Sequence, residues 1–395
     1  MRTPFWLPVL LGFLTAVGPV STDMYLPAFP AIEAALGVPE GSAQITLATW
    51  FAGLAVGQVT QGTLSDRFGR RGPPVVGTLV YTAASAGCAL APDLLSLSIW
   101  RAVAAFGGSA SMVIPRAVVR DLADGHAAAR LMARLILVMG AAPILAPTLG
   151  GLMLARTGWQ AIFWAATAYG AVCCVLVWLL LPDTLPRTAR VRLGAAGVLA
   201  RFGVIVRERG FITHALMGGA GMFGMFAYIS GSPPVYIQMF GLSPAEYGMI
   251  FGLCAAGYVT AAQLNSPLLS RIGTGRILNA ASACYLVAAL ALCGVAFGRV
   301  TVLPAVVVPI FCALACMGLI LPNAAVGALS RHAPHAGSAS ALMGTLQFIL
   351  GASSSVLAGW LTDGTPRGIA ALMLAGAVGA VIANALRPRV SPPSP

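Results

Sequence analysis

The chain has 395 residues, of which 58% are hydrophobic and only 9% are charged. Soluble domains carry roughly 25% charged residues, so this composition excludes an ordinary water-exposed protein and makes lipid the solvent for most of the chain. The net charge of +12 arises from 23 basic residues, all of them Arg, which bear on membrane topology rather than on nucleic acid.

Long apolar segments follow one another along the whole chain. One membrane span requires roughly 20 apolar residues, so twelve spans with short turns take roughly 33 residues each, which fits the chain length. The expected spans are 5–31, 43–62, 72–92, 94–115, 131–154, 159–181, 211–235, 245–266, 277–297, 302–322, 337–360 and 368–386. This pattern predicts an all-α membrane protein with twelve transmembrane helices.

The arginines are distributed unevenly across the membrane. If the N-terminus starts in the cytoplasm and the spans alternate, nineteen of the 23 Arg fall on cytoplasmic segments. Only Arg156, Arg299 and Arg367 fall outside, and Arg101 lies within a span. The positive-inside rule then predicts that both termini are cytoplasmic. Because topology accounts for the positive charge, we expect no nucleic-acid partner.

Span 1 contains an acid away from both of its ends. Asp23 lies about seven residues inside the outer end, taken as Pro30. A charge at mid-helix costs roughly 2.5–3.5 kcal/mol, so its retention indicates a function or a partner. We interpret Asp23 as a proton- or cation-binding carboxyl group; the alternative is a hydrated residue of an outer vestibule. Cleavage of this span as a signal peptide is disfavoured, because eleven more spans follow.

The loop after span 2 combines glycines, an acid and three arginines within ten residues. Its members are Gly62, Asp66, Arg67, Gly69, Arg70 and Arg71. The glycines permit a tight turn, and Asp66 can interact with a helix N-terminus, where the dipole favours an anion. Arg70 requires a counter-charge, for which Asp121 at the inner end of span 4 is the candidate. We interpret this set as a conformational gate, formed in one state and broken in the other; the alternative is simple anchoring by Arg.

Span 4 contains the complementary charge. Arg101 lies about seven residues from the outer end of its span, taken as Leu94, at a depth similar to that of Asp23. This depth indicates a shared cavity without establishing contact. We assign Asp23 to proton coupling and place Arg101 in the same cavity.

Span 5 carries closely spaced Pro and Gly residues, namely Pro143, Pro147, Gly150 and Gly151. Such residues let a helix kink and approach its neighbour closely. We expect this neighbour to be span 8, through Gly252 and Gly257.

The connection after span 6 is long and basic and divides the chain into two six-helix halves. The halves are expected at 1–182 and 211–395, joined by a cytoplasmic amphipathic linker at 183–210 that lies on the membrane surface or acts as a plain tether. Arg67 and Gly69 after span 2 correspond to Arg271 and Gly273 after span 8. A six-plus-six repeat of this kind is a transporter arrangement around a midplane site.

The eight Cys all lie inside predicted spans, where they act as small packing residues. Cys312 and Cys316 share a helix face, but no His or acid accompanies them. We therefore expect no metal site and no disulfide, and the sequence indicates no cofactor.

Several of these segments resemble the major facilitator superfamily. The loop at 62–71 resembles its motif A, and 142–151 resembles motif C, the antiporter motif. Arg101 resembles the arginine of motif B in proton-coupled members, which implies a role for Arg101 in proton coupling together with Asp23. Segments 21–27, 116–121 and 224–233 resemble the Bcr/CflA drug-resistance branch. Ala104 departs from motif B, in which Gln is frequent. The resemblance implies a twelve-helix, monomeric drug:proton antiporter of the bacterial inner membrane, acting on compounds such as bicyclomycin and chloramphenicol.

A drug site combines apolar and aromatic side chains with a few polar groups. The candidates are Tyr25, Trp50, Met112, Met139, Met225, Tyr228, Gln347 and Phe348. The function predicted is proton-coupled efflux of small amphiphilic drugs. The alternatives are export of a metabolite, such as a sugar or amino-acid derivative, and a membrane sensor that transports nothing. An enzyme is not expected, because no nucleophile or His/acid constellation is present.

Overall fold

The computed structural model of the chain describes residues 6–122, 125–186, 188, 190, 202–330 and 336–388. Within these ranges, the side chains of residues 120, 125–140, 336 and 337 are outside the description. Within the predicted linker at 183–210, residues 187, 189 and 191–201 lie outside the described residues.

Helices dominate both halves of the described chain. The first span is built from four pieces, α1 (Leu7–Thr15), α2 (Val17–Thr22), η1 (Leu26–Ala28) and α3 (Phe29–Leu36). The other spans of the N-terminal half are α4 (Gln44–Phe68), α5 (Gly72–Ala89), α6 (Leu94–Leu122), α7 (Gly125–Thr157) and α8 (Trp159–Leu180). The C-terminal half contains α10 (Arg209–Pro233) continued by η3 (Pro234–Met239), α11 (Pro244–Ile272), α12 (Thr274–Phe297), α13 (Leu303–Leu329), α14 (Ala336–Trp360) and α15 (Arg367–Ala385).

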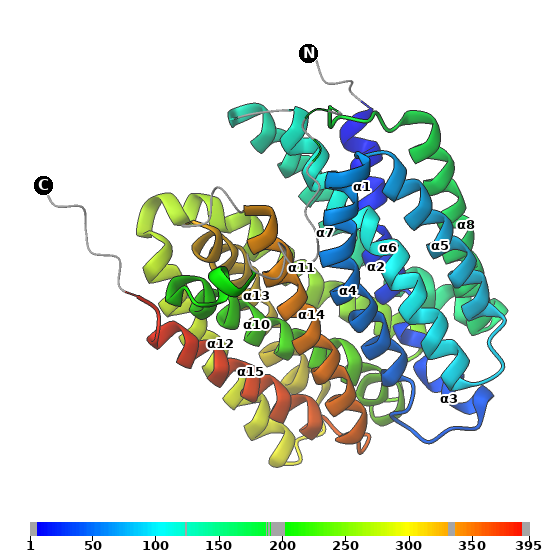
Figure 1. Cartoon of the computed structure of the whole chain (residues 1–395). Coiled ribbons are helices and arrows are strands. Elements are labelled where there is room, and N and C mark those ends of the chain that lie inside the picture. Colours follow the sequence, from blue (N-terminus) through cyan, green and yellow to red (C-terminus); the bar gives the residue numbers. More distant parts are fainter. Residues whose placement is uncertain are drawn as a thin grey trace, which may run out of the picture.

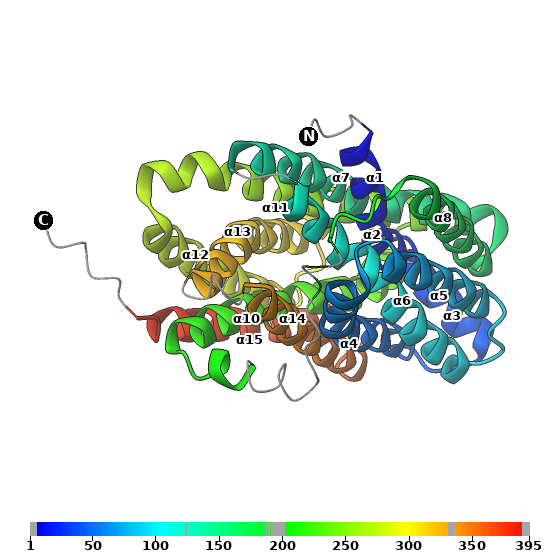
Figure 2. The ribbon, with the colours of Figure 1, turned by 45° about the horizontal axis from the view of Figure 1, so that its top comes forward.

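The helices form two bundles that lie side by side (Figures 1 and 2). In the N-terminal bundle α6 packs between α4 and α5, and α5 also contacts α8. In the C-terminal bundle α10 packs against α13, α14 and α15, while α12 contacts α13 and α15. The bundles meet along two helix pairs, α4 with α14 and α7 with α11. The prediction of twelve spans in two six-helix halves is confirmed.

The composition of the helices explains their place in a membrane. Among the described residues, nine helical segments are long and apolar enough to span a bilayer on length and composition alone. The helices α4, α5 and α7 complete the twelve. Part of α4 is less apolar because Gly53 and Gly57 face α6, where an added Cβ would lie 2.3 Å from the Ala102 carbonyl oxygen and 2.1 Å from Ser109 Oγ respectively.

The helix ends differ from the predicted spans mainly on one side of the molecule. The helices α4, α6, α11 and α13 continue to Phe68, Leu122, Ile272 and Leu329, where the apolar segments ended at 62, 115, 266 and 322. Helical hydrogen bonding needs no apolar side chain, so these helices extend beyond the hydrophobic part of the sequence. We call this side, which carries the α4–α5 turn, the Arg70 end, and the opposite side the Gly41 end.

The weak internal repeat has a structural counterpart. Gly69 follows α4 with φ of 95°, and Gly273 follows α11 with φ of 78°. L-residues with a side chain rarely adopt this region, so both turns require Gly for the same backbone reason. The aligned loops of the two halves thus fold alike.

Candidate functional site

The first span is interrupted at its acidic residue. Helix α2 ends at Thr22, Asp23 is its C-cap, and regular helix resumes only after the short η1 turn. Pro27 has no amide hydrogen to donate to the Asp23 carbonyl four residues earlier, so the α-helical ladder cannot continue through this position. The sequence itself therefore places the carboxyl group at a break in a membrane helix.

Asp23 is buried near the contact between the N-terminal half and the C-terminal half. It is 6% exposed, and Thr22 Oγ1 donates a hydrogen bond to its Oδ1 at 2.8 Å. The η1 turn that follows Asp23 contacts α10 and α11 of the other half. A buried carboxyl group with one side-chain donor among the described residues, next to a turn that contacts the opposite bundle, is sensitive to how the bundles pack.

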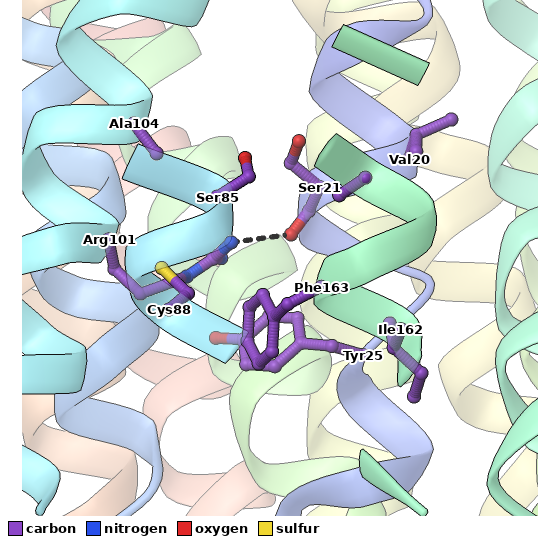
Figure 3. Close-up of a pocket in the computed structure, with 10 residues that line it drawn as sticks. Val20, Ser21, Tyr25, Ser85, Cys88, Arg101, Ala104, Ile162 and Phe163 are labelled. Carbon is purple, nitrogen blue, oxygen red and sulfur yellow. Dashed lines mark hydrogen bonds between the residues drawn. The ribbon is translucent and has the colours of Figure 1, made fainter. Parts of the chain in front are cut away.

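Arg101 is held inside the N-terminal bundle by aromatic rings (Figure 3). Its guanidinium carbon lies 4.2 Å from the ring centre of Tyr25 and 4.4 Å from that of Trp50. The side chain is 2% exposed, and Nη1 donates to the Ser21 carbonyl at 2.9 Å. Its Nε and Nη2 have no hydrogen-bond partner among the described residues.

The two buried charges are neighbours without forming an ion pair. Arg101 bonds the backbone of Ser21, two residues before Asp23, yet no ion pair within 4 Å joins the two side chains in the described part of the chain. The aromatic contacts of a desolvated guanidinium contribute about 2 kcal/mol, which offsets only part of the several kcal/mol that burial of an ion costs. The positive charge of Arg101 is therefore only partly compensated, and a negative charge nearby would stabilise it.

The Pro/Gly segment of span 5 lies against both the first span and α11. A Cβ on Gly150 would lie 1.7 Å from the Met24 carbonyl oxygen, next to Asp23. A Cβ on Gly151 would lie 2.3 Å from the Pro244 carbonyl oxygen of α11. Only glycine permits these approaches, so Gly150 and Gly151 fix the spacing around the acid. Pro143 and Pro147 lie within the same helix.

Span 5 was predicted to contact span 8 through Gly252 and Gly257. The contact through Gly252 is present, and the one through Gly257 is not. A Cβ on Gly252 would lie 2.8 Å from the Ile144 carbonyl oxygen of α7, as predicted. Gly257 instead faces the ring of Phe311 on α13, because five residues turn the helix by about 500° and thus to another side.

Close backbone packing seals the Gly41 end. An added Cβ on Gly41 would lie 2.5 Å from the Gly359 carbonyl oxygen, and the reverse distance to Gly41 is 2.6 Å. Nearer the middle, Thr345 Oγ1 donates to the Ala55 carbonyl at 3.1 Å. Figure 1 shows the bundles separating toward the end where the N-terminus lies. This conformation is closed at the Gly41 end.

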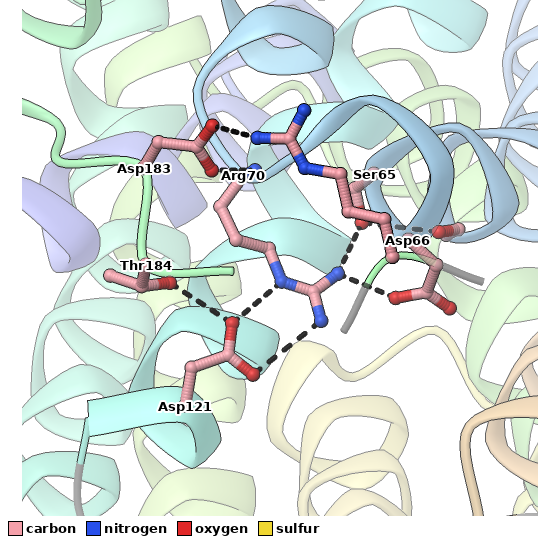
Figure 4. A network of polar contacts seen from close by, with 8 residues as sticks. Ser65, Asp66, Arg70, Asp121, Asp183 and Thr184 are labelled. Carbon is pink, nitrogen blue, oxygen red and sulfur yellow. Dashed lines mark hydrogen bonds and ion pairs between the residues drawn. The ribbon is translucent and has the colours of Figure 1, made fainter. Parts of the chain in front are cut away.

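The predicted gate residues form a compact polar cluster at the Arg70 end (Figure 4). Arg70 Nε donates to Asp121 Oδ2 at 2.7 Å, and Nη1 donates to Asp66 Oδ1 at 2.6 Å and to Ser65 Oγ at 2.7 Å. Arg70 is 3% exposed. Burial alone would lower the pKa of Arg70, but its bonds to Asp121 and Asp66 hold it above the usual value. We call these residues, with Asp183 and Thr184, the Arg70 cluster.

Asp183 was missed by the sequence analysis. Its Oδ1 accepts the backbone amide of Arg70 at 2.8 Å, and its Oδ2 pairs with Arg190 at 2.6 Å. Thr184 Oγ1 donates to Asp121 Oδ2 at 3.0 Å. In the sequence, the only feature that could have indicated its role is the position of this acid just after span 6, at the start of the predicted linker. The Arg70 cluster thus joins α4, α6 and the segment after α8 within one half.

The remaining gate residues lie around this cluster. Arg71 donates to the Trp178 carbonyl of α8, and the Arg67 guanidinium lies 5.2 Å from the ring centre of Phe68. Gly62 has open space beside it, since an added Cβ would meet nothing closer than 3.9 Å. Gly62 is therefore not required by packing here.

The substrate candidates fall into three structural groups. Tyr25, Trp50 and Tyr228 are fully buried in aromatic packing and line no open surface in this conformation. Met112, Met225, Gln347 and Phe348 are partly exposed. The side chain of Met139 lies outside the described residues.

An aromatic contact that the sequence did not reveal joins the two halves. The ring centres of Phe51 on α4 and Phe226 on α10 are 3.8 Å apart, and Phe348 on α14 lies 6.2 Å from Phe51. A Cβ on Gly351 would lie 2.1 Å from the Phe226 ring, so this glycine makes room for the contact. The three rings form an apolar bridge between the bundles.

A twelve-helix protein with paired bundles, a buried acid and cation in one of them, and a charged turn at one end has the architecture of a major-facilitator transporter. The chain belongs to the Major Facilitator Superfamily, whose family model matches residues 11–355. It is accordingly a multi-pass membrane transporter of small molecules.

Related proteins agree with the resemblance drawn from the motifs. The chain is similar to an uncharacterized MFS-type transporter, YdgK, of Bacillus subtilis, with 31% identity over 374 residues that cover 94% of this chain and 92% of that protein. It is 27% identical over 352 residues to a bicyclomycin resistance protein homolog of Haemophilus influenzae, covering 89% and 88% of the two chains. It is 29% identical over 286 residues to a chloramphenicol resistance protein of Pseudomonas aeruginosa, covering 72% and 67%.

Solved structures confirm the fold. A D-xylose-proton symporter superposes with a TM-score of 0.75 at 16% identity, covering 96% of this chain and 95% of that one. A bacterial homolog of the human lysosomal transporter Spinster, inward-facing and unoccupied, gives 0.74 at 16% identity, covering 97% and 95%.

Proposed function

We propose that this transporter exports small amphiphilic drugs, with compounds of the chloramphenicol and bicyclomycin type as the first candidates, in exchange for protons. The observation that carries the proposal is the Asp23 carboxyl group, buried at a break in the first span beside an incompletely bonded Arg101. The drug-resistance names of two relatives support the substrate class.

The membrane orientation follows from charge. The Arg70 end carries the excess of arginine and, by the positive-inside rule, faces the cytoplasm of a bacterial inner membrane with both termini. The Gly41 end then faces outward. In that orientation the conformation described above is closed to the outside, and Asp23 is buried beneath the closed end.

Closure of the Gly41 end is linked to protonation of Asp23, because burying a charged carboxylate costs free energy. When the Gly41 end opens, Asp23 is hydrated and binds a proton from outside. Closing the end removes water from the carboxyl group, which favours its neutral form because an isolated buried carboxylate is costly. The protonated carrier therefore turns inward more readily than the charged one.

Release completes the cycle at the inner side. Arg101 stabilises the anionic form of a carboxyl group in its vicinity, so a drug that enters from the cytoplasm and loosens the packing around Tyr25 and Trp50 promotes loss of the proton. The deprotonated carrier with bound drug then opens outward. The membrane potential adds roughly 2.3 kcal/mol per charge per 100 mV to such a cycle.

The Arg70 cluster and the Pro/Gly segment have separate roles in this proposal. The cluster stiffens the inner end of the N-terminal half, and Asp66, which is exposed although it pairs with Arg70, can meet the other half when that end closes. Gly150 and Gly151 keep the first span and α11 close enough to exclude water around Asp23.

The test is drug transport driven by a pH gradient in proteoliposomes. Asp23→Asn is compared with Glu33→Gln, a matched loss of a buried acid in the same span, whose Oε1 accepts the Ala43 backbone amide at 2.9 Å. We expect Asp23→Asn to lose proton-driven uptake of chloramphenicol and Glu33→Gln to retain it.

Other outcomes count against the proposal. Proton-driven uptake by Asp23→Asn at the native rate would remove Asp23 from the coupling mechanism. Transport of sugars or amino-acid derivatives but of no drug would favour the metabolite exporter. Absence of any flux would favour a sensor.

A further inference from the structure

A second interrupted helix lies in the C-terminal half. Helix α10 ends at Pro233 and continues as the π-helical segment η3. Pro233 and Pro234 have no amide hydrogen to donate to the carbonyl groups four residues earlier, so the α-helical pattern of hydrogen bonds cannot continue through them. Short π-helical segments within a helix are frequent at functional sites. The sequence therefore imposes a break at this position.

This break agrees with the internal repeat. The alignment that pairs Arg67 with Arg271 sets residues 23–28, where the first span is broken, against residues 227–232, directly before η3. Interrupted segments at corresponding positions of the two halves point to the binding site of a transporter. The first break carries the acid to which we assigned the proton, so the second is the corresponding place for groups that contact the drug.

Two tyrosine hydroxyls at the second break lack hydrogen-bond partners. Tyr228 lies near the end of α10 and Tyr236 lies within η3, and each is only 1% exposed. Neither hydroxyl oxygen has a partner among the described residues. Two other buried tyrosines of this half are bonded, since Tyr247 meets Ser232 Oγ at 3.0 Å and Tyr285 donates to a backbone carbonyl of α15 at 3.0 Å. The missing partners are thus a property of the break.

The two tyrosines pack against helix α11. The ring centres of Tyr228 and Tyr236 are 6.5 Å apart, and the Tyr228 ring stacks on Phe251 at 5.5 Å. The Tyr247 ring lies 6.1 Å from Tyr236 and 6.0 Å from Phe251. These four rings fill the space between α11 and the end of α10 with η3. We call them the Tyr228 seam, which contains no charged side chain.

The N-terminal half covers this seam in the present conformation. The η1 turn contacts both α10 and α11. Next to Tyr247, an added Cβ on Gly248 would lie 2.6 Å from the Cα atom of Thr148 on α7. Both η1 and α7 belong to the N-terminal half, which moves away from α10 and α11 when the Gly41 end opens. Opening therefore uncovers the Tyr228 seam.

The unpartnered hydroxyls disfavour the closed conformation. A buried hydroxyl without a partner shifts an equilibrium against the buried state by roughly 5- to 150-fold. A phenol hydroxyl both donates and accepts hydrogen bonds, so an uncharged hydroxyl or amide group of a ligand can satisfy it. A charged ligand group would find no counter-charge among these rings.

We propose that the hydroxyls of Tyr228 and Tyr236 are a subsite for an uncharged polar group of the drug, whose apolar part lies against the rings of the Tyr228 seam. This subsite rests on the proposed function, because it assigns a contact to the exported compound. Its hydrogen bonds improve as the seam is uncovered, so bound drug favours the opening of the Gly41 end that the transport cycle requires. The drugs selected are neutral amphiphiles.

The first test needs no drug. We expect Tyr228→Phe and Tyr236→Phe to raise the melting temperature, because each removes a buried hydroxyl that lacks a partner. Tyr285→Phe is the matched control, and it should lower the melting temperature because its hydroxyl is bonded. In a Gly151→Ala background, which favours the open Gly41 end, the two variants should also raise the ratio of closed to open protein by at least roughly 5-fold.

The second test is binding of chloramphenicol to the purified protein in that background, measured by equilibrium dialysis. The open fraction is read from spin labels at Glu40→Cys and Leu361→Cys, on either side of the Gly41 end, and the apparent affinity is divided by it. The corrected affinity should fall by roughly 2- to 10-fold in Tyr228→Phe and in Tyr236→Phe, and remain unchanged in Tyr285→Phe.

The outcomes separate the subsite from the proposed function. A lower melting temperature in Tyr228→Phe and Tyr236→Phe would show that the hydroxyls are bonded in the closed conformation and would overturn the subsite. Unchanged corrected affinity, in a protein that binds chloramphenicol, would also overturn the subsite and leave drug export intact. If the native protein binds no drug, the proposed function fails and the subsite fails with it.

Discussion

Gly151→Ala is expected to shift the protein away from the conformation that is closed at the Gly41 end. The added Cβ would lie 2.3 Å from the Pro244 carbonyl oxygen, 2.6 Å from its carbon and 2.9 Å from the Ala245 nitrogen. All three atoms belong to the backbone, which cannot rotate away as a side chain can. Helix α11 must therefore move from α7.

The magnitude follows from the cost of overpacking. Inserting one methyl group into a tight contact costs about 1–3 kcal/mol, which is a change of roughly 5- to 150-fold in a two-state equilibrium. The strain exists only while the two helices are in contact, so it is relieved when the Gly41 end opens. The closed population falls by that factor.

The assay is a spin-label distance measurement between Glu40→Cys and Leu361→Cys, which flank the Gly41–Gly359 contact. Exposed Cys284 and Cys312 are first replaced by Ser. Gly151→Ala should add or enlarge a long-distance population. Gly62→Ala is the control, since its Cβ meets nothing closer than 3.9 Å. Identical distance distributions for the two variants would refute the packing argument.

Three other perturbations test separate parts of the structure. Arg70→Gln leaves Asp121 without its cation, so we expect a loss of about 3 kcal/mol in stability, seen as a lower melting temperature, with partial recovery in Arg70→Asp/Asp121→Arg; equal melting of both variants and the native protein would contradict the cluster. Trp50→Leu should cost about 2 kcal/mol and Trp50→Phe less, because the smaller ring retains part of its attraction for Arg101; a ranking in the opposite order would contradict the aromatic contact. Phe51→Ala removes the bridge to Phe226 and Phe348 and should open the Gly41 end in the same spin-label measurement, whereas an unchanged distance would assign the three rings to packing alone.

Length and hydropathy determined most of the fold. The helices α5, α6 and α8 begin at 72, 94 and 159, as predicted. At these positions the sequence changes from polar or turn-forming residues to an apolar run, which marks the boundary between water and lipid. The helical extensions beyond the membrane were not predicted, since polar residues such as Asp66 and Arg67 continue a helix without any apolar signal.

The site was predictable where chemistry left few choices. With only 11 acids in the chain, Asp121 was one of few counter-charges available to Arg70, and the structure brings the two together. Asp183 was missed because its role depends on where the segment after α8 folds back. The rings around Arg101 come from three separate spans, with Tyr25 in the first span, Trp50 on α4 and Phe163 on α8, so no local sequence pattern reveals them.

Proton release on drug binding tests the central claim most directly. Chloramphenicol or bicyclomycin is added to the purified protein in weakly buffered detergent solution, and the released protons are read with a pH-sensitive dye. We predict release from the native protein and from Glu33→Gln, and none from Asp23→Asn. Equal release from Asp23→Asn and the native protein would contradict the assignment of Asp23 as the group that exchanges its proton for the drug.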